Sequence, residues 1–424
     1  MVYDRRDLFF VKVESYMERS NARQNLLMVL CWAIYTVAYL GRYSYNSSIN
    51  LIMSDYRVDH ASAGLVTTFF FFGYGAGQLI NGLLCQKYNK RILFPLVLAS
   101  SAAINIALYF GVPFVSVKYL WLINAFMQSC LWPSIILIVS QYMDGKHLKR
   151  ALLLLSTPAP LGTFLAYSAS TIFVQIGHYR LSFFVGAAAM VAAAVLWLMF
   201  YPQIRVLPLQ IVSEPNQKEK DKAGKKCLTM GIGMLVSVLC VFAVIHNFIK
   251  DGLQTWVPAI LKETQGVSDS LAVFLSLLLP LLGIFGAMIS LAAEKKICNL
   301  VLLCTGAFAI AVPLILLVAK VLSASIVVSL ISFGVVVLLM HAINSVITSI
   351  APLRLRSKTN SGRMAGILNA CCYVGSTISS YLLGLIADSF GWNTVVNVLL
   401  MAAILAVILG AAFILVQRRK SICE

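Results

Sequence analysis

Two basic residues lie deep inside long apolar stretches of the sequence, where a charged side chain is rare and usually functional. Arg42 falls within the stretch 25–53, and Lys250 falls within the stretch 228–261. A charge at the centre of a bilayer costs at least ~2.5–3.5 kcal/mol on insertion scales, so such residues normally face a bundle interior or a water-filled cavity. We expect these two cations to bind an anion from solution.

The acidic residues offer these cations little compensation. All 16 Asp and Glu residues lie in tails, loops or the ends of apolar stretches, except Asp251. Adjacent residues of a helix point about 100° apart, so we expect Asp251 to lie on a different face from Lys250. Two simpler interpretations stay open: snorkelling of the cations to a membrane interface, or an internal pair between Lys250 and Asp251.

Further polar residues recur at helical spacing on the same stretches and on two others. They are Tyr35, Tyr39 and Asn46 near Arg42, then Tyr74, Gln78 and Asn81, then His246 and Gln254 near Lys250, and finally His341 and Asn344. Spacings of three, four or seven residues place side chains on one face of a helix. A lone His on such a face is more often a packing partner than a ligand, but four polar faces together predict a hydrated anion-binding cavity.

The composition shows what kind of protein must position these residues. The chain has 424 residues, of which 60% are hydrophobic and 12% are charged, and its mean hydropathy is +0.87. Ordinary soluble domains are about 45–50% apolar and about 25% charged. Too little charge is present to cover a soluble globule, so a soluble enzyme, a nucleic-acid-binding protein and a disordered protein are all disfavoured.

The apolar stretches are long enough to cross a membrane, which takes about 20 residues per helix. We predict an all-α membrane protein with twelve transmembrane helices in two pseudo-symmetric six-helix halves. The predicted spans are about 25–53, 61–85, 92–112, 117–142, 150–176, 180–202, 228–261, 271–293, 297–319, 323–350, 362–387 and 392–417.

The basic residues predict the orientation of the bundle. Of the 33 Lys and Arg residues, 26 lie in the two terminal segments and in every second loop, and only five lie in the other loops. Cytoplasmic loops carry an excess of Lys and Arg, so both termini should be cytoplasmic. The net charge of +17 thus reflects topology in a cell (inner) membrane, with the lipid bilayer as partner and no nucleic acid.

The most polar stretch divides the predicted spans into six and six. We expect a cytoplasmic N-terminal segment 1–24, a first half 25–203, a cytoplasmic linker 204–227, a second half 228–417 and a cytoplasmic tail 418–424. A similar loop pattern follows the second span (Gly82–Arg91) and the eighth span (Ser290–Lys296), which suggests a repeat. Two such halves with a substrate site between them near the midplane form a transporter architecture.

Several motifs occur in the order expected of a known family. They are Tyr39–Arg42, Tyr74–Gly82, Gln128–Pro133, Lys250–Pro258, Ser361–Gly366 and Asp388–Trp392, together with a loop at Gly82–Arg91 in which Gln86 and Asn89 depart from the superfamily signature. This set resembles the organophosphate:phosphate antiporters of the major facilitator superfamily, which include glycerol-3-phosphate and hexose-6-phosphate exchangers.

The resemblance implies roles for particular residues. Arg42 and Lys250 match the two basic residues that bind the substrate phosphate, although Lys binds phosphate as a point charge where Arg forms a bidentate fork. The resemblance also places tyrosines near the site, which here are Tyr35, Tyr39, Tyr74 and, more loosely, Tyr373. Gln78 stands where the glycerol-phosphate carrier has Lys. That carrier also has a histidine in its fifth span, and here the Ser156–Pro160 stretch takes its place. The two prolines of this stretch should kink the fifth span of this chain.

We therefore predict a secondary active transporter for a small organic anion. The expected substrate is an organophosphate or phosphonate exchanged for inorganic phosphate by alternating access, and the expected site is Arg42 and Lys250 with the four tyrosines, Gln78 and His341. No enzymatic activity, cofactor or metal is predicted, and we expect a monomer. A proton-coupled carrier for carboxylates or sugar acids and a membrane sensor of sugar phosphate remain alternatives, whereas a channel is disfavoured.

Overall fold

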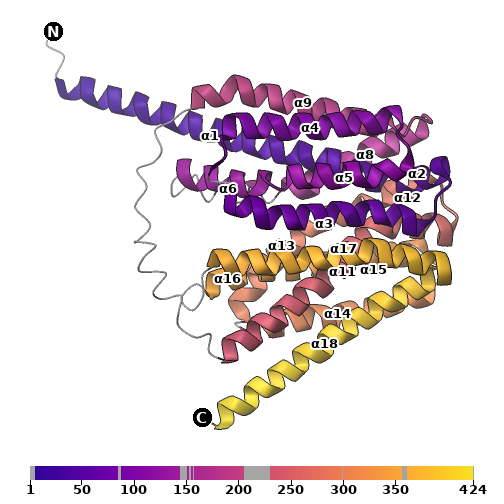
Figure 1. The fold of residues 1–424 in the computed structure, drawn as a ribbon. Helices are drawn as coiled ribbons and strands as arrows, with labels where there is room; N and C mark the ends of the chain where they lie inside the picture. The colour runs from indigo at the N-terminus through magenta and orange to yellow at the C-terminus, as the bar shows by residue number, and fades with distance from the viewer. Residues whose placement is uncertain are drawn as a thin grey trace.

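The computed structural model describes residues 5–84, 87–143, 150–151, 154–155, 157–204, 230–297, 299–355 and 361–423. These residues form a bundle in which most helices run roughly along one axis, while α11 and α18 run obliquely to it (Figure 1). The helices of the N-terminal half are α1 (Arg5–Ser47), α2 (Ile49–Tyr56), α3 (His60–Leu84), α4 (Lys90–Phe110), α5 (Phe114–Gln128), α6 (Leu131–Tyr142), α8 (Pro158–Gln175) and α9 (Leu181–Phe200). Those of the C-terminal half are α11 (Met230–Gln265), α12 (Asp269–Ser276), α13 (Leu278–Lys296), α14 (Leu300–Val321), α15 (Ile326–Ser345), α16 (Ala351–Arg354), α17 (Ser361–Phe390) and α18 (Trp392–Cys423).

The predicted all-α fold is confirmed. Within the described residues, eleven helices are long and apolar enough to cross a membrane, and α8 takes the place of the predicted fifth span. Some predicted spans are built from two consecutive helices, because α5 gives way to α6 after Gln128 and α12 gives way to α13 at Leu277. The structure is thus that of a twelve-span bundle with local breaks.

The two prolines that were predicted to kink the fifth span lie where a helix begins. Helix α8 begins at Pro158, and the described residues 150–151 and 154–155 before it are also helical. Pro158 and Pro160 therefore lie in the first turn of α8, where a proline costs little because the first N–H groups of a helix lack partners within it.

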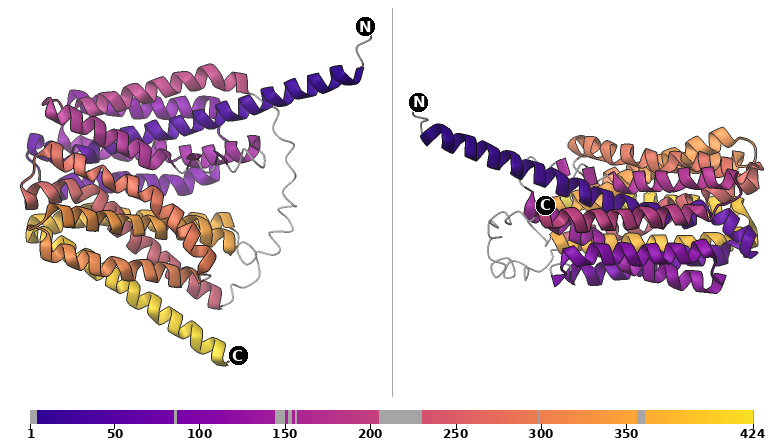
Figure 2. Two further views of the ribbon diagram at one scale, coloured as in Figure 1. Left: turned by 180° about the vertical axis from the view of Figure 1, so that it is seen from behind. Right: turned by 90° about the horizontal axis from the view of Figure 1, so that it is seen from above.

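Both ends of the chain lie at the same end of the bundle (Figures 1 and 2). We call this the terminal end, and we call the end that contains Tyr56 and His60 the opposite end. The two halves contact each other mainly through α3 against α17, with further contacts of α8 with α12 and α13 and of α1 and α2 with α11. A site between the halves is therefore walled by these helices.

Helices α3 and α17 approach closely because each carries glycine at the crossing. A side chain on Gly64 would collide with the carbonyl oxygen of Ser380, and one on Gly384 would collide with the carbonyl oxygen of His60. Only hydrogen atoms occupy these positions, so the two backbones meet near the opposite end.

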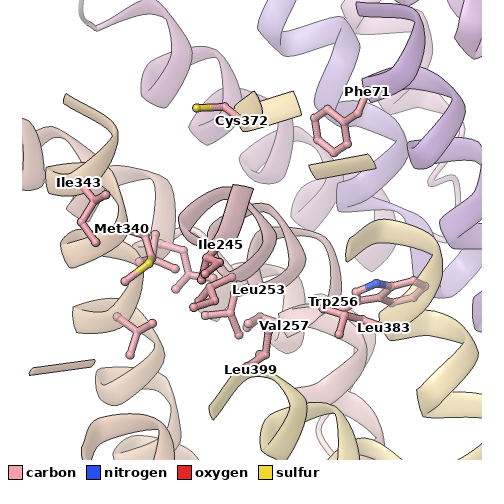
Figure 3. Packing of buried hydrophobic residues seen from close by; sticks show 14 of the residues in the cluster. Phe71, Ile245, Leu253, Trp256, Val257, Met340, Ile343, Cys372, Leu383 and Leu399 are labelled. Carbon is pink, nitrogen blue, oxygen red and sulfur yellow. The ribbon is translucent and has the colours of Figure 1, made fainter. Parts of the chain in front are cut away.

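Helix α11 packs into a buried apolar cluster that includes residues of both halves. Ile245, Leu253 and Val257 belong to the cluster that also holds Met340 of α15 and Leu399 of α18 (Figure 3). Helix α11 therefore packs through apolar side chains against both α15 and α18.

Candidate functional site

Arg42 is held in a cage of aromatic rings. Its guanidinium carbon lies 4.3 Å from the ring centre of Tyr39, 4.4 Å from that of Tyr74 and 5.1 Å from that of Phe70. The residue is only 6% exposed. Ring faces are electronegative and attract a cation, more strongly where water is excluded. The cage stabilises the charge of Arg42 without neutralising it.

The polar support of Arg42 is an amide and carries no charge. Gln128 Oε1 accepts hydrogen bonds from Nε and Nη2 of Arg42 at 3.3 and 3.2 Å. The Gln128 amide nitrogen donates to Asn124 Oδ1 at 3.0 Å and to Ser101 Oγ at 3.4 Å. This chain of contacts fixes the orientation of Gln128, so that its oxygen faces the guanidinium.

Sequence reasoning did not assign Gln128 or Asn124 to the site, although the motif Gln128–Pro133 contributed to the resemblance. Both are fully buried on α5 and are separated by four residues, which is the spacing of one helix face. That polar spacing in an apolar span was the signal that could have identified them.

The tyrosines expected at the site do come together. Tyr35 OH lies 3.5 Å from Tyr74 OH, and the ring centres of Tyr35 and Tyr39 are 5.1 Å apart. Tyr373 of α17 brings its ring centre within 5.1 Å of that of Tyr74, across the interface between the halves. Tyr35 also stacks on Trp132, with ring centres 5.0 Å apart. An aromatic wall therefore surrounds Arg42 and includes residues of both halves.

Lys250 is paired with Asp251, which is the internal pair that the sequence left open as an alternative. Its Nζ is 3.3 Å from Asp251 Oδ1, and the two side chains are 12% and 7% exposed. The two side chains leave the helix in directions about 100° apart and still meet. The four-carbon stem of Lys is flexible enough to bring its ammonium back to a neighbouring carboxylate.

Asp251 is also tied to the helix that faces it. The hydroxyl of Ser376 on α17 donates to Asp251 Oδ2 at 2.5 Å and accepts from the Asn247 amide at 2.9 Å. One carboxylate oxygen thus contacts Lys250 and the other contacts α17. Arg42 lies on α1 and the pair of Lys250 and Asp251 lies on α11, and these two helices contact each other between the halves.

His341 and His246 occupy different environments. His341 Nε2 lies 3.3 Å from the side-chain nitrogen of Gln254, which places it beside the polar face of α11. His246 is fully buried, and its ring nitrogens contact the backbone oxygen of Phe242 at 2.9 Å and Asn344 Oδ1 at 3.3 Å. His246 is therefore a packing partner, as a lone histidine most often is.

Gln78 lies one turn from Tyr74 and contacts the other half. Its Oε1 accepts a hydrogen bond from the Asn369 amide at 2.5 Å. Both residues line a small cavity that also includes Tyr373. A second small cavity is lined by Arg42 and Asn46 among others. Gln78 is thus placed at an interface between the halves, next to the aromatic wall.

The halves are joined between this region and the opposite end. The Asn46 amide donates to Thr255 Oγ1 at 3.2 Å, and Tyr167 OH donates to the backbone oxygen of Gln254 at 2.9 Å. Beyond them, at the end of the bundle, His60 contacts both Glu263 and Asp388. These contacts hold the two halves together on that side of the charged residues.

Helical halves that enclose charged and aromatic residues at membrane depth define a polytopic membrane transporter. The model of the Major Facilitator Superfamily matches residues 31–361, which is more than half of the chain. The chain belongs to this superfamily.

Curated relatives match shorter parts of the sequence. The membrane sensor protein UhpC of Escherichia coli (strain K12) is 27% identical over 106 residues, which are 25% of this chain and 24% of that protein. Sugar phosphate exchanger 3 of Bos taurus is 25% identical over 141 residues, or 31% of this chain and 28% of that protein. The chloroplastic ascorbate transporter of Arabidopsis thaliana is 26% identical over 155 residues, or 34% of this chain and 28% of that protein. The matched parts span about a quarter of the length of these relatives.

Solved structures match almost the whole chain. A bacterial homologue of the human lysosomal transporter Spinster, in an inward-facing and unoccupied conformation, superposes with a TM-score of 0.75 at 15% identity and covers 92% of this chain and 96% of that one. A mutant form of the nucleoside transporter NupG gives a TM-score of 0.70 at 10% identity and covers 92% of this chain and 99% of that one. At such low identity these similarities show the fold alone.

Proposed function

We propose that the protein is a secondary active transporter that exchanges a small organic anion, of the phosphate-ester or phosphonate class, for inorganic phosphate. The observation that carries the proposal is Arg42, a buried cation whose described contacts are aromatic rings and one amide. A charge buried without a counter-charge is costly, and an anionic substrate would supply the missing counter-charge.

The chemistry of the site fits an oxyanion. A guanidinium presents several N–H donors in a planar fork, and an ammonium adds a compact positive charge, so Arg42 and Lys250 together would clamp a phosphoryl group. The hydroxyls of Tyr35 and Tyr74 and the side chains of His341 and Gln78 would contact the remaining oxygens or the organic part. Relatives named as a sugar phosphate exchanger and an ascorbate transporter support a small anion as substrate.

Alternating access would follow from the arrangement of the contacts between the halves. Contacts such as that of Tyr167 with Gln254 hold the bundle together toward the opposite end. Rocking of the halves about the site would break these contacts and form others near the terminal end. The excess of Lys and Arg in the terminal segments and alternate loops supports a cell membrane orientation with both termini in the cytoplasm.

The proposal is tested with purified protein in liposomes loaded with phosphate. Uptake of labelled phosphate should occur in the wild type and should fall roughly thirtyfold or more in Arg42→Ala, because truncating a buried charged contact costs about 2–5 kcal/mol. Lys320→Ala is the matched control, since Lys320 is exposed near the end of α14 and its loss should leave uptake unchanged. Equal uptake by the Arg42→Ala variant and the wild type would refute the proposal.

Two other functions give different results in the same vesicles. A proton-coupled carboxylate carrier, which the buried Asp251 favours, would take up its substrate under a pH gradient without internal phosphate. A sensor, which the similarity to UhpC favours, would bind a phosphate ester without any flux.

A further inference from the structure

We propose that Asp251 sets the charge of the anion that this protein carries, so that the site selects a singly charged anion over a doubly charged one. The inference rests on the proposed function and narrows its substrate class. The carboxylate of Asp251 already neutralises Lys250, and the charge of Arg42 is left for the substrate.

The first support is the geometry of Asp251, whose two oxygens are both engaged. Oδ1 lies 3.3 Å from the Lys250 ammonium, and Oδ2 accepts from the Ser376 hydroxyl at 2.5 Å. Ser376 in turn holds the Asn247 amide at 2.9 Å. A carboxylate fixed from two helices in this way forms part of the wall of the site and is an ion-pair partner of Lys250.

The second support is the charge balance of the described region around the site. The middle of the described spans contains three charged residues of the Arg, Lys, Asp and Glu types. They are Arg42, Lys250 and Asp251. The other titratable groups nearby are tyrosines and the imidazoles of His246 and His341. Imidazole has an ordinary pKa of about 6.5 and tyrosine one of about 10. The fixed charge of the site is therefore one positive unit when these side chains are neutral.

A doubly charged anion would meet a penalty in such a site. One of its charges is matched by Arg42, but the second has to compete with Asp251 for Lys250. If the anion displaces Asp251 from Lys250, the carboxylate is left buried with a hydroxyl as partner, and burying an unpaired charge is costly. If Asp251 keeps its contact with Lys250, the second charge of the anion stays close to the carboxylate in a region of low dielectric, where repulsion is strong.

The favoured substrates are therefore monoanions with an oxyanionic headgroup. Phosphodiesters, monoesters of phosphonates, carboxylates and the singly protonated form of a phosphate monoester all meet this condition. The fully ionised phosphate monoester, whose second pKa is about 6, would be the poorer ligand at neutral or higher pH.

The test uses a pair of ligands that differ by one methyl group and one charge. At pH 8, methyl phosphate is a dianion and dimethyl phosphate is a monoanion, and binding of each to the purified full-length protein is measured by isothermal titration calorimetry. The wild type should bind dimethyl phosphate more tightly. In Asp251→Asn the site carries two positive charges, and the ratio of the two affinities should shift toward methyl phosphate by about tenfold or more.

Two further variants complete the design. Lys250→Gln combined with Asp251→Asn restores a single positive charge, so this double variant should again prefer dimethyl phosphate as the wild type does. The double variant also contains no unpaired lysine, which could prevent Asp251→Asn alone from folding. Asp55→Asn removes one acidic charge at the opposite end, away from the site, and should leave the preference unchanged.

The outcomes separate the two proposals. If Arg42→Ala binds both ligands as the wild type does, the proposed function fails. If Arg42→Ala loses both ligands while Asp251→Asn keeps the wild-type preference, the proposed function stands and the role of Asp251 is wrong. A double variant that prefers methyl phosphate would also overturn that role, since its fixed charge equals that of the wild type.

Discussion

Asp388 of α17 holds the first residue of α3, His60, by both its backbone and its ring. Asp388 Oδ1 accepts from the His60 backbone N–H at 3.0 Å and lies 2.5 Å from Nδ1 of the same residue, while Oδ2 accepts from the Ala61 N–H at 2.7 Å. The first N–H groups of a helix have no partners within the helix. A carboxylate of the C-terminal half therefore caps a helix of the N-terminal half.

We predict that Asp388→Asn weakens the closure at the opposite end. Loss of a cap costs about 1 kcal/mol, and here the lost contact also joins the halves, so the population that is open at this end should rise severalfold. Spin labels at the exposed positions Arg57 and Ser389 should report longer distances by pulsed electron paramagnetic resonance.

Asp59 provides the matched control for this variant. Its Oδ1 accepts from the Ser62 N–H at 2.8 Å, so it caps the same helix from within its own half. Asp59→Asn should lower stability by a similar amount without lengthening the measured distances. Equal distance changes in the two variants would contradict the closure role of Asp388.

We predict that Asp55 contributes to stability in a pH-dependent way. Hydrogen bonds from Tyr179 and Arg180 lower the pKa of the Asp55 carboxyl below its ordinary value. For an acid with a lowered pKa in the folded state, the stabilisation is present above the pKa of the unfolded state, about 3.9, and is lost as the pH falls through the folded-state pKa. Because the pair is partly exposed, its contribution is under ~1 kcal/mol.

Thermal unfolding between pH 3 and pH 6 measures this contribution. Asp55→Asn should be slightly less stable than the wild type at pH 6, and the difference should shrink as the pH approaches 3. A difference that stays constant over this range would show that the carboxylate of Asp55 is not responsible.

We predict that Gln128→Glu weakens anion binding more than Gln128→Ala does. In the first variant a carboxylate would lie about where the amide oxygen now contacts Arg42, and it would neutralise the charge on which the substrate depends. We expect a loss of about a hundredfold for Glu and about tenfold for Ala, measured as the affinity for dimethyl phosphate. A Glu variant that binds as well as the Ala variant would argue against Arg42 as the anion site.

We predict that the aromatic ring of Tyr39 contributes more to the thermal stability of the protein than its hydroxyl does. Tyr39→Phe keeps an aromatic face 4.3 Å from the guanidinium carbon, whereas Tyr39→Leu removes it. Since a desolvated cation–π contact is worth up to about 2 kcal/mol, we expect Leu to lower the thermal stability and Phe to leave it nearly unchanged. If both variants lost the same thermal stability, the hydroxyl and not the ring of Tyr39 would be the stabilising group.

The sequence predicted those features that depend on periodicity and composition. The apolar stretches gave the helices, and the helical spacing of Tyr35, Tyr39 and Arg42 correctly placed them on one side of a helix. The position of Tyr74 beside them follows from the family fold, and the structure agrees.

Other features depend on how helices pack, which periodicity does not encode. The pair between Lys250 and Asp251 could only be left open as an alternative, because a rule about directions on a helix does not describe the reach of a long side chain. The contact of Arg42 with Gln128 joins residues 86 positions apart, and that of His60 with Asp388 joins residues 328 positions apart. Each requires the relative placement of two helices, which the folded structure supplies.

The aromatic cage has a consequence for the membrane that contains the protein. A carrier that opens to one side exposes its centre to water, and small cations could then leak through it if the centre were neutral or acidic. The ring faces fix the positive charge of Arg42 in place, and a fixed positive charge repels Na⁺ and protons from a pore. The same side chain that would attract an anion would thus exclude small cations from the proposed site.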